Sequence, residues 1–412
     1  METISDPYRR HLFDNDSTFN VYKEETTNLS VGAPGPDLLQ YCAEMMKKAT
    51  DHRLEEEKKE GKYYLFQYGI TAGLWECREE LAKFLTRRYG DPVKRENLIL
   101  TCGASHGLQL LLNTIIAPNG IIFVEEVTYM IALDAFKQFP LMKIITVPMK
   151  NDMVDVNAFE KIVMEQKCDN FLTNEQKIFW AMFYTIPTFH NPTGSTLSVE
   201  NCKRLVEIAR KNSIIIACDD VYNLLYYEDG LPPHRLFFYD QPTDSEYRDG
   251  NIISNGTFSK IFSPGLRFGW MECSPRIAKI FRQSGILCSG GAVNHYISGI
   301  VTSLLQLNMQ DNYLDKLIQI YKERLSVLCN ILDHCLPQGC SYKRPEGDIK
   351  GSNFIEWCQK TFKVSAIPGI RFSYLENSHN FLRLSISFHK KEILETATKT
   401  LCKALFNYIY NV

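Results

Sequence analysis

The chain has 412 residues, which is long enough for two domains, because a single hydrophobic core seldom grows beyond about 250–300 residues. Hydrophobic residues make up 45% and charged residues 23%, the composition of a globular protein without a predicted membrane span. A formal net charge of -2 gives no indication of a nucleic-acid or anionic-membrane partner. The 13 cysteines lack C-x-x-C and Cys/His metal spacings, which predicts reduced core thiols and no metal site.

The N-terminal 30 residues are polar and acidic and show no clear hydrophobic period. They lack the apolar region of a signal peptide, and mitochondrial presequences avoid acidic residues, so a cytoplasmic location is expected. A Gly/Pro turn follows at 32–36, where Gly32 would allow the backbone to approach another group closely. An ordinary loop is an equal alternative at this position.

Helices and short apolar strands then alternate along most of the chain. Apolar residues at helical spacing predict helices over 37–53, 74–89, 108–115, 132–138, 156–164 and 199–212. Apolar runs predict strands over 97–101, 120–126, 143–147, 178–186, 213–218 and 252–255. The charged stretch 54–62 is expected to be solvated, and 165–176 to be a loop insertion. This alternation predicts an α/β fold with a mainly parallel central sheet flanked by helices and functional residues at its carboxyl edge.

The segment 254–270 surrounds Lys260 with hydroxyl groups and glycines. Small and apolar neighbours indicate a partly buried amine, which is easier to deprotonate and therefore a usable nucleophile. Such a lysine can form a Schiff base with an aldehyde cofactor. Thr257, Ser259 and Arg267 are close enough in sequence to hold a phosphate. A surface lysine and arginine beside a Gly/Pro turn are the alternative.

This segment resembles the lysine motif of fold type I pyridoxal-phosphate aminotransferases, near the aminoadipate/kynurenine and aromatic branch. The motif is Ser/Thr-x-Ser-Lys, present at 257–260, followed by Pro-Gly-Leu-Arg-x-Gly-Trp at 264–270. The resemblance extends from about Gly32 to Phe388. It implies a transaminase that carries pyridoxal 5'-phosphate on Lys260 and moves an amino group from an α-amino acid to a 2-oxo acid by a ping-pong mechanism.

Four residues in the first half of the chain have implied cofactor contacts. The strand 97–101 turns through small residues into a helix, and such a turn is an anion site because free N–H groups converge there. The resemblance assigns the phosphate to the N–H groups of Ala104 and Ser105. It places the ring of Tyr129 flat on the pyridine ring. Asn191, in an Asn-Pro-Thr-Gly turn, would donate to the ring hydroxyl, unless this is an ordinary turn.

Asp219 and Tyr222 follow the buried strand 213–218. The resemblance assigns Asp219 to the ring nitrogen, which a carboxylate keeps protonated so that the ring accepts electrons. It assigns Tyr222 as a second donor to the ring oxygen. With Lys260 they form the implied catalytic set, whereas the neighbouring Asp220 is expected only to cap a turn.

Two further residues are implied at the edges of the site. Tyr68, in a Tyr-Gly-x-x-x-Gly loop, would reach the phosphate of the neighbouring subunit, which predicts a homodimer with shared active sites. A core tyrosine is the alternative. Arg383, in the alternating stretch 381–388, would bind the substrate α-carboxylate in bidentate fashion, with Gly32 and Asn191 beside it. An edge-strand arginine is the alternative for that position.

The character of the chain changes after about residue 290. Long helices are expected over 293–333, strands over 353–357, 364–367 and 381–388, and a final helix over 391–410. We therefore expect a large cofactor domain at 41–290 and a smaller α+β domain built from 1–40 and 291–412. Aromatic residues allow a kynurenine, aromatic or aminoadipate-like side chain in the substrate without ranking them: Phe189, Tyr226, Tyr227 and Phe354.

Two other functions stay open. A β-lyase, decarboxylase or cyclising lyase could use the same cofactor, and these reactions depend on substrate orientation, which motifs do not specify. A PLP-binding regulator or inactive scaffold is the non-enzyme alternative. Such regulators carry a DNA-binding module in front, for which 30 polar residues are too few, and Lys260, Asp219 and Arg383 are all present.

Overall fold

The structure, a computed structural model, describes residues 26–244, 247, 249–291, 294–342 and 351–410. The described residues form two compact units. The small unit comes from Met1–Gly35, Glu323–Ile370 and His379–Val412, and the large unit from Pro36–Lys322 and Arg371–Ser378. The boundary expected at residue 290 is therefore wrong and lies at 322, because helix α10 (His295–Gln306) packs against two helices of the large unit.

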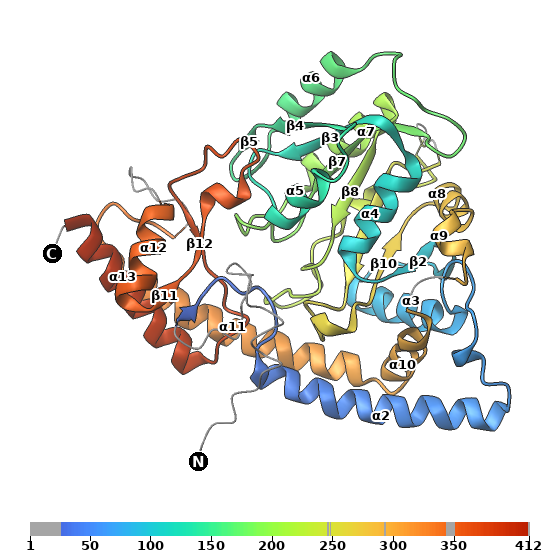
Figure 1. Ribbon diagram of the computed structural model, residues 1–412, viewed down its shortest axis with the longest axis horizontal. Coiled ribbons are helices and arrows are strands. Elements are labelled where there is room, and N and C mark those ends of the chain that lie inside the picture. The colour runs from blue at the N-terminus through green and yellow to red at the C-terminus, as the bar shows by residue number, and fades with distance from the viewer. Residues whose placement is uncertain (1–25, 245–246, 248, 292–293, 343–350, 411–412) are drawn as a thin grey trace. The chain divides into compact units, whose positions relative to one another are not determined.

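A seven-stranded sheet forms the centre of the large unit, in the order β2-β10-β9-β8-β7-β3-β4 (Figure 1). Its strands are β2 (Leu98–Thr101), β3 (Ile116–Glu125), β4 (Lys143–Val147), β7 (Phe179–Thr185), β8 (Ile215–Asp219), β9 (Ile252–Thr257) and β10 (Gly269–Glu272). Adjacent strands are parallel except β10, which is antiparallel to both β2 and β9. The predicted mainly parallel sheet is confirmed, and β10 is a strand that the sequence analysis missed.

Helices cover both faces of this sheet (Figure 1), so β7 and β8 are buried at every residue. One face packs against α6 (Val156–Gln166) and α7 (Val199–Asn212), through side chains such as Phe183. Successive side chains of a strand point to opposite faces. Tyr184 and Asp219 therefore point to the other face, where Tyr184 packs edge-on against Phe136 of α5 (Met130–Phe136).

The other helices of the large unit are α2 (Pro36–Glu60), α3 (Trp75–Tyr89), α4 (Ala104–Ile115), α8 (Pro275–Arg282), α9 (Gly285–Cys288) and the first part of α11 (Met309–Cys335). Helix α2 continues past its expected end at residue 53; most of the stretch 54–62 is exposed, as expected, but one of its side chains is not. Glu57 is buried and accepts a hydrogen bond from Arg53 one turn earlier, at 2.5 Å. It also accepts from the N–H of Leu65, which fixes the chain beyond the helix.

Shorter elements complete the large unit. A hairpin joins β5 (Met149–Lys150) to β6 (Met153–Val154), and single 3-10 turns occupy Tyr64–Phe66, Arg95–Asn97, Leu236–Tyr239 and Pro264–Leu266. The expected loop insertion begins two residues late, because α6 includes residues 165 and 166, and the rest of it, 167–176, has no regular structure. Its Phe171 ring stacks on Trp180, and the N–H of Leu172 donates to Asn119. The insertion is thus held at the amino end of β7, the opposite end from the predicted site.

The small unit combines α12 (Gly351–Phe362), α13 (Lys391–Tyr410) and the end of α11 with two short strand pairs. The pairs are β1 (Thr27–Asn28) with β11 (Val364–Ser365), and β12 (Ile367–Pro368) with β13 (Leu382–Arg383). The final helix is confirmed at its predicted bounds. The strand expected over 353–357 is wrong: Phe354 and Cys358 are buried one helical turn apart, and a short apolar run does not by itself distinguish the two structures.

Candidate functional site

A cradle for an anion forms where strand β9 meets the start of helix α4. Thr257 Oγ1 and Ser259 Oγ are buried and 3.0 Å apart, and Arg267 Nη1 lies 3.5 Å from Ser259 Oγ. Gly103, at the N-cap of α4, has a φ of 85°, and a Cβ there would lie 3.1 Å from Arg267 Nη2. Within the described part of the chain Arg267 pairs with no carboxylate, so two hydroxyls, a guanidinium and a helix N-terminus converge.

The first turn of α4 contains Ala104 and Ser105, the two residues predicted to bind a phosphate through their N–H groups. N–H groups in the first turn of a helix have no partner within the helix. Asn255 of β9 donates from Nδ2 to the carbonyl of Ala104 at 2.9 Å. This hydrogen bond, which the sequence analysis did not assign, fixes the helix start beside the loop that carries Lys260.

Asp219 ends strand β8 as a buried carboxylate. Its Oδ2 accepts a hydrogen bond from the Tyr184 hydroxyl at 2.7 Å, whereas its buried Oδ1 accepts none from the described residues. Burial raises the pKa of the Asp219 carboxyl to about 6, against the effect of the Tyr184 hydrogen bond; Asp220 raises that pKa further and Lys260 lowers it. The structure thus brings Asp219 and Lys260 within electrostatic reach of each other.

Lys260 follows β9 by three residues and is half-buried between the buried side chains Phe258 and Ile261. Tyr129 and Tyr222 lie near the Tyr184 hydroxyl that donates to this carboxylate. Burial and the negative charge of Asp219 raise the pKa of the Tyr184 hydroxyl, and the two other tyrosines add to the rise. Lys260 is therefore near Asp219, and Tyr129 and Tyr222 are near Tyr184, a residue that sequence reasoning missed.

The turn that carries Asn191 is attached to the sheet through its neighbour His190. The His190 Nε2 lies 3.0 Å from Glu125 Oε2 at the end of β3, and both side chains are buried. Glu125 also accepts a hydrogen bond from Thr185 Oγ1 at 2.9 Å. On its other side, His190 Nδ1 lies 2.9 Å from Thr193 Oγ1. A glutamate that ends an apolar strand was the available sequence signal for this cluster.

Arg383 and Gly32 lie together in the small unit. A Cβ on Gly32 would be 3.2 Å from Arg383 Nη1, so glycine allows the guanidinium to lie against this backbone. The segment before Gly32 is fixed by the stretch after Arg383: Ser385 donates its N–H to Leu29 O at 2.7 Å, and Ser387 Oγ donates to Val31 O at 3.1 Å. The other predicted site residues all belong to the large unit.

Tyr68 is 83% exposed, so the core-tyrosine alternative is wrong. Its ring lies against Gly290, where a Cβ would approach to 2.6 Å. Other exposed apolar side chains occur along the same loop and on α10, and the Phe66 and Tyr296 rings are 5.9 Å apart. We call this surface the aromatic patch; it comprises Tyr64, Phe66, Tyr68, Ile70 and Tyr296.

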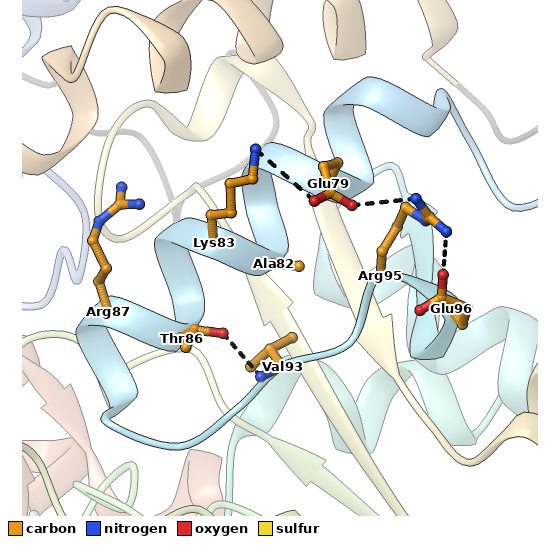
Figure 2. Close-up of a pocket in the computed structure, with 8 residues that line it drawn as sticks. All are labelled: Glu79, Ala82, Lys83, Thr86, Arg87, Val93, Arg95 and Glu96. Atoms are coloured by element: carbon orange, nitrogen blue, oxygen red, sulfur yellow. Dashed lines mark hydrogen bonds and ion pairs between the residues drawn. The ribbon is translucent and has the colours of Figure 1, made fainter.

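A separate open pocket lies between α3 and the turn before β2 (Figure 2). Its charged residues already have ionic partners: Glu79 pairs with both Lys83 and Arg95, and Arg95 also pairs with Glu96. Arg87 pairs with Asp311 outside the pocket. None of its lining residues is a predicted site residue. We therefore assign it no ligand.

All 13 cysteines are free thiols in the structure. Among the described residues, no group of three or more His, Cys, Asp or Glu side chains is arranged to hold a metal ion. A search of the same residues finds no helix with the length and apolar character needed to cross a membrane.

A family model described as aminotransferase class I and II matches residues 24–401. The chain belongs to this family. It is 28% identical over 397 residues to aromatic-amino-acid aminotransferase 1 of Thermococcus litoralis, with 93% of this chain and 89% of the relative covered. It is 25% identical to 2-aminoadipate transaminase of Thermus thermophilus, covering 91% and 88%. The solved kynurenine aminotransferase of Pyrococcus horikoshii is 26% identical, with a TM-score of 0.77 and 94% and 92% covered.

Membership of this family confirms the resemblance on which the site assignments were made, together with the fold type and amino-group transfer as the reaction. Enzymes of aminotransferase class I and II depend on pyridoxal phosphate. The roles of the individual site residues follow as proposals from the geometry of the large and small units.

Proposed function

We propose that this transaminase binds pyridoxal 5'-phosphate at the carboxyl edge of the large-unit sheet and transfers amino groups from an aromatic, kynurenine or 2-aminoadipate type amino acid to a 2-oxo acid. The observation that carries the proposal is the carboxylate of Asp219. It is buried, one oxygen is held by Tyr184, and Oδ1 accepts no hydrogen bond from any described residue. An unsatisfied buried acceptor is costly unless a ligand donates to it, as a protonated ring nitrogen would.

The remaining residues fit the two ends of the cofactor. The cradle of Thr257, Ser259 and Arg267 beside the α4 N-terminus suits a phosphate dianion. Asn191 and Tyr222 would donate to the ring oxygen, and the Tyr129 ring would stack on the pyridine face. When bound, the cofactor would supply an aldehyde for the lysine amine and a ring that withdraws electrons from the substrate α-carbon.

Lys260 and Arg383 would act on the substrate itself. The Lys260 amine, placed within electrostatic reach of Asp219, would be the base that takes the proton from the substrate α-carbon and delivers it to the 4′-carbon of the bound cofactor. Arg383 presents a planar pair of N–H donors to the α-carboxylate, against the backbone at Gly32. Asp219 supplies the negative charge that keeps the ring nitrogen protonated.

The substrate class rests on aromatic side chains and on the relatives. The Phe189 and Tyr226 rings stack at 6.4 Å in the large unit, and these side chains can contact an extended apolar group. Phe354, which the sequence analysis included, lies in the small-unit core and is removed from this set. The names of the relatives, aromatic-amino-acid aminotransferase and 2-aminoadipate transaminase, agree with this range of substrates.

We also propose a homodimer in which Tyr68 completes the site of the partner. The aromatic patch exposes large apolar rings on one loop and on α10, which is the surface chemistry of a protein interface. Size-exclusion chromatography with light scattering should give twice the mass of the chain, and Tyr68→Phe should weaken phosphate-dependent cofactor binding. A monomer that binds the cofactor fully would contradict this assignment. The cytoplasmic location stays a prediction.

The proposed function is tested with a panel of amino donors against 2-oxoglutarate and pyruvate. We expect the visible absorption band of the bound cofactor to bleach with a good donor and to return when a 2-oxo acid is added. A lyase would instead release pyruvate or ammonia and keep the band without an acceptor. Absence of a visible band after supply of pyridoxal phosphate would contradict the cofactor assignment and favour a scaffold.

A further inference from the structure

We propose that Tyr184 is a positioning residue for Asp219: its hydroxyl holds Oδ2 and thereby leaves Oδ1 as the oxygen available to the ring nitrogen. This inference rests on the proposed cofactor site. Tyr184 lies seven residues before Asn191, inside β7, and no motif of the chain singles it out.

The strand register explains how Tyr184 reaches the carboxylate. Tyr184 on β7 stands opposite Ala217 on β8, and Asp219 is two residues further along β8 on the same face. Because the alanine side chain is small and buried, the tyrosine ring can extend past it to the end of the strand. The Tyr184 hydroxyl then lies 2.7 Å from Asp219 Oδ2.

The ring is fixed and the direction of the hydrogen bond is set. Tyr184 is fully buried, and its ring packs edge-on against Phe136 at 5.3 Å and 74°. Burial and the adjacent carboxylate keep the pKa of the tyrosine hydroxyl well above its ordinary range, so the hydroxyl stays protonated and donates. A hydrogen bond donated to a carboxylate favours its ionised form.

Of the groups that the structure describes near Asp219, the Tyr184 hydroxyl is one of only two that favour its ionised form. Lys260, after β9, favours the ionised carboxylate, whereas the neighbouring Asp220 opposes it. Tyr129 and Tyr222, from the start of α5 and the turn after β8, lie near Tyr184. Burial is the largest influence and favours the protonated form. Removal of the Tyr184 hydroxyl would leave Lys260 alone to oppose burial.

The test uses Tyr184→Phe, which keeps the ring and its packing and removes only the hydroxyl. Infrared difference spectroscopy of the apoprotein against pH reports the carbonyl band of protonated Asp219, assigned by its absence in Asp219→Asn. We expect the midpoint of this band to rise by about one pH unit, which is about tenfold in the proton affinity. We also expect cofactor affinity and kcat to fall about tenfold, with KM for the amino acid little changed.

Tyr89→Phe is the matched control. Tyr89 is buried in the same unit, and its hydroxyl has no hydrogen-bond partner among the described residues. This variant should leave the infrared midpoint and the cofactor affinity at wild-type values. An unshifted midpoint in Tyr184→Phe would overturn the inference. If the wild-type protein binds no pyridoxal phosphate, the proposed cofactor site fails, while the apoprotein midpoint still decides whether Tyr184 controls Asp219.

Discussion

Two neighbouring aspartates at the end of β8 have opposite surroundings. Asp219 faces the α5 side, where a single donor holds one of its oxygens. Asp220 points to the other face, where its Oδ2 accepts from Ser254 Oγ at 2.5 Å and its Oδ1 lies 3.3 Å from Asn223 Nδ2. Ser254 in turn lies 3.4 Å from Nη1 of Arg235.

Arg235 is the centre of a buried ionic cluster on that side of the sheet. Its Nη2 lies 3.0 Å from Asp91 Oδ2, its Nη1 pairs with Glu272, and its guanidinium lies 4.0 Å from the centre of the Tyr89 ring. Buried charges of this kind are stable only when partners satisfy them. The comparison shows that Asp91 and Glu272 share a buried guanidinium that neutralises them, whereas Asp219 is held by a neutral hydroxyl, on the face where a ligand is proposed to bind.

The strongest test of this comparison is Asp219→Asn. Because an amide cannot keep the ring nitrogen protonated, we expect turnover to fall about 10³–10⁴-fold, which corresponds to roughly 4–5 kcal/mol of barrier height. Steady-state kinetics with saturating cofactor measures the change. The matched variant Asp220→Asn should keep most of the turnover, and equal losses in both variants would remove the distinction between the two sites.

Arg235→Met is expected to lower the stability of the protein and to leave its cofactor site intact. It leaves Asp91 and Glu272 buried without their cation, which should lower the free energy of unfolding by about 3–5 kcal/mol. Urea denaturation measures that change. The protein that remains folded at low temperature should bind cofactor with the wild-type absorption spectrum, and a lost spectrum with unchanged stability would show that the cluster belongs to the active site.

The cost of burying Asp219 should appear as a pH dependence of stability. The pKa of this carboxyl is raised from 3.8 to about 6 in the folded protein, so the folded state binds the proton more tightly than the unfolded state. The free energy of unfolding of the apoprotein should therefore decrease as the pH rises from about 4 to about 6. This group contributes about 3 kcal/mol at most to the decrease. The Asp219→Asn variant should lack the part of this decrease that Asp219 causes. Urea unfolding of both proteins at pH 4.5 and pH 7.5 measures the difference. A wild-type and variant difference that is independent of pH would contradict it.

The smallest expected effect concerns the small unit. In Gly32→Ala the new methyl group would lie 3.2 Å from Arg383 Nη1 and displace the guanidinium by a few tenths of an ångström. We expect KM for the amino donor to rise about three- to tenfold, roughly 1 kcal/mol, with little change in cofactor binding. Gly285→Ala is the control, because a Cβ there meets no atom within 4 Å. An equal KM in both variants would show that Gly32 has no role in binding the substrate carboxylate.

Part of this protein could be predicted from local sequence alone. The alternation of apolar runs and helical spacing predicted the parallel sheet, and helices α7 and α13 lie at their expected bounds. Lys260 and Asp219 were identified because each lies in a short segment whose chemistry is local, either a motif or the end of a buried strand. Such signals need no knowledge of which strands are neighbours.

The tertiary structure decided the partners of these residues. Tyr184 meets Asp219 across 35 positions, His190 meets Glu125 across 65, and Arg235 meets Asp91 across 144. Each contact depends on strand order and register, which local patterns do not contain. Packing also extended α2, through buried Glu57, and moved the unit boundary to residue 322. Sequence by itself predicted which groups could carry the chemistry, and long-range packing decided how deeply each is buried and which partner it meets, because burial is a property of the whole fold.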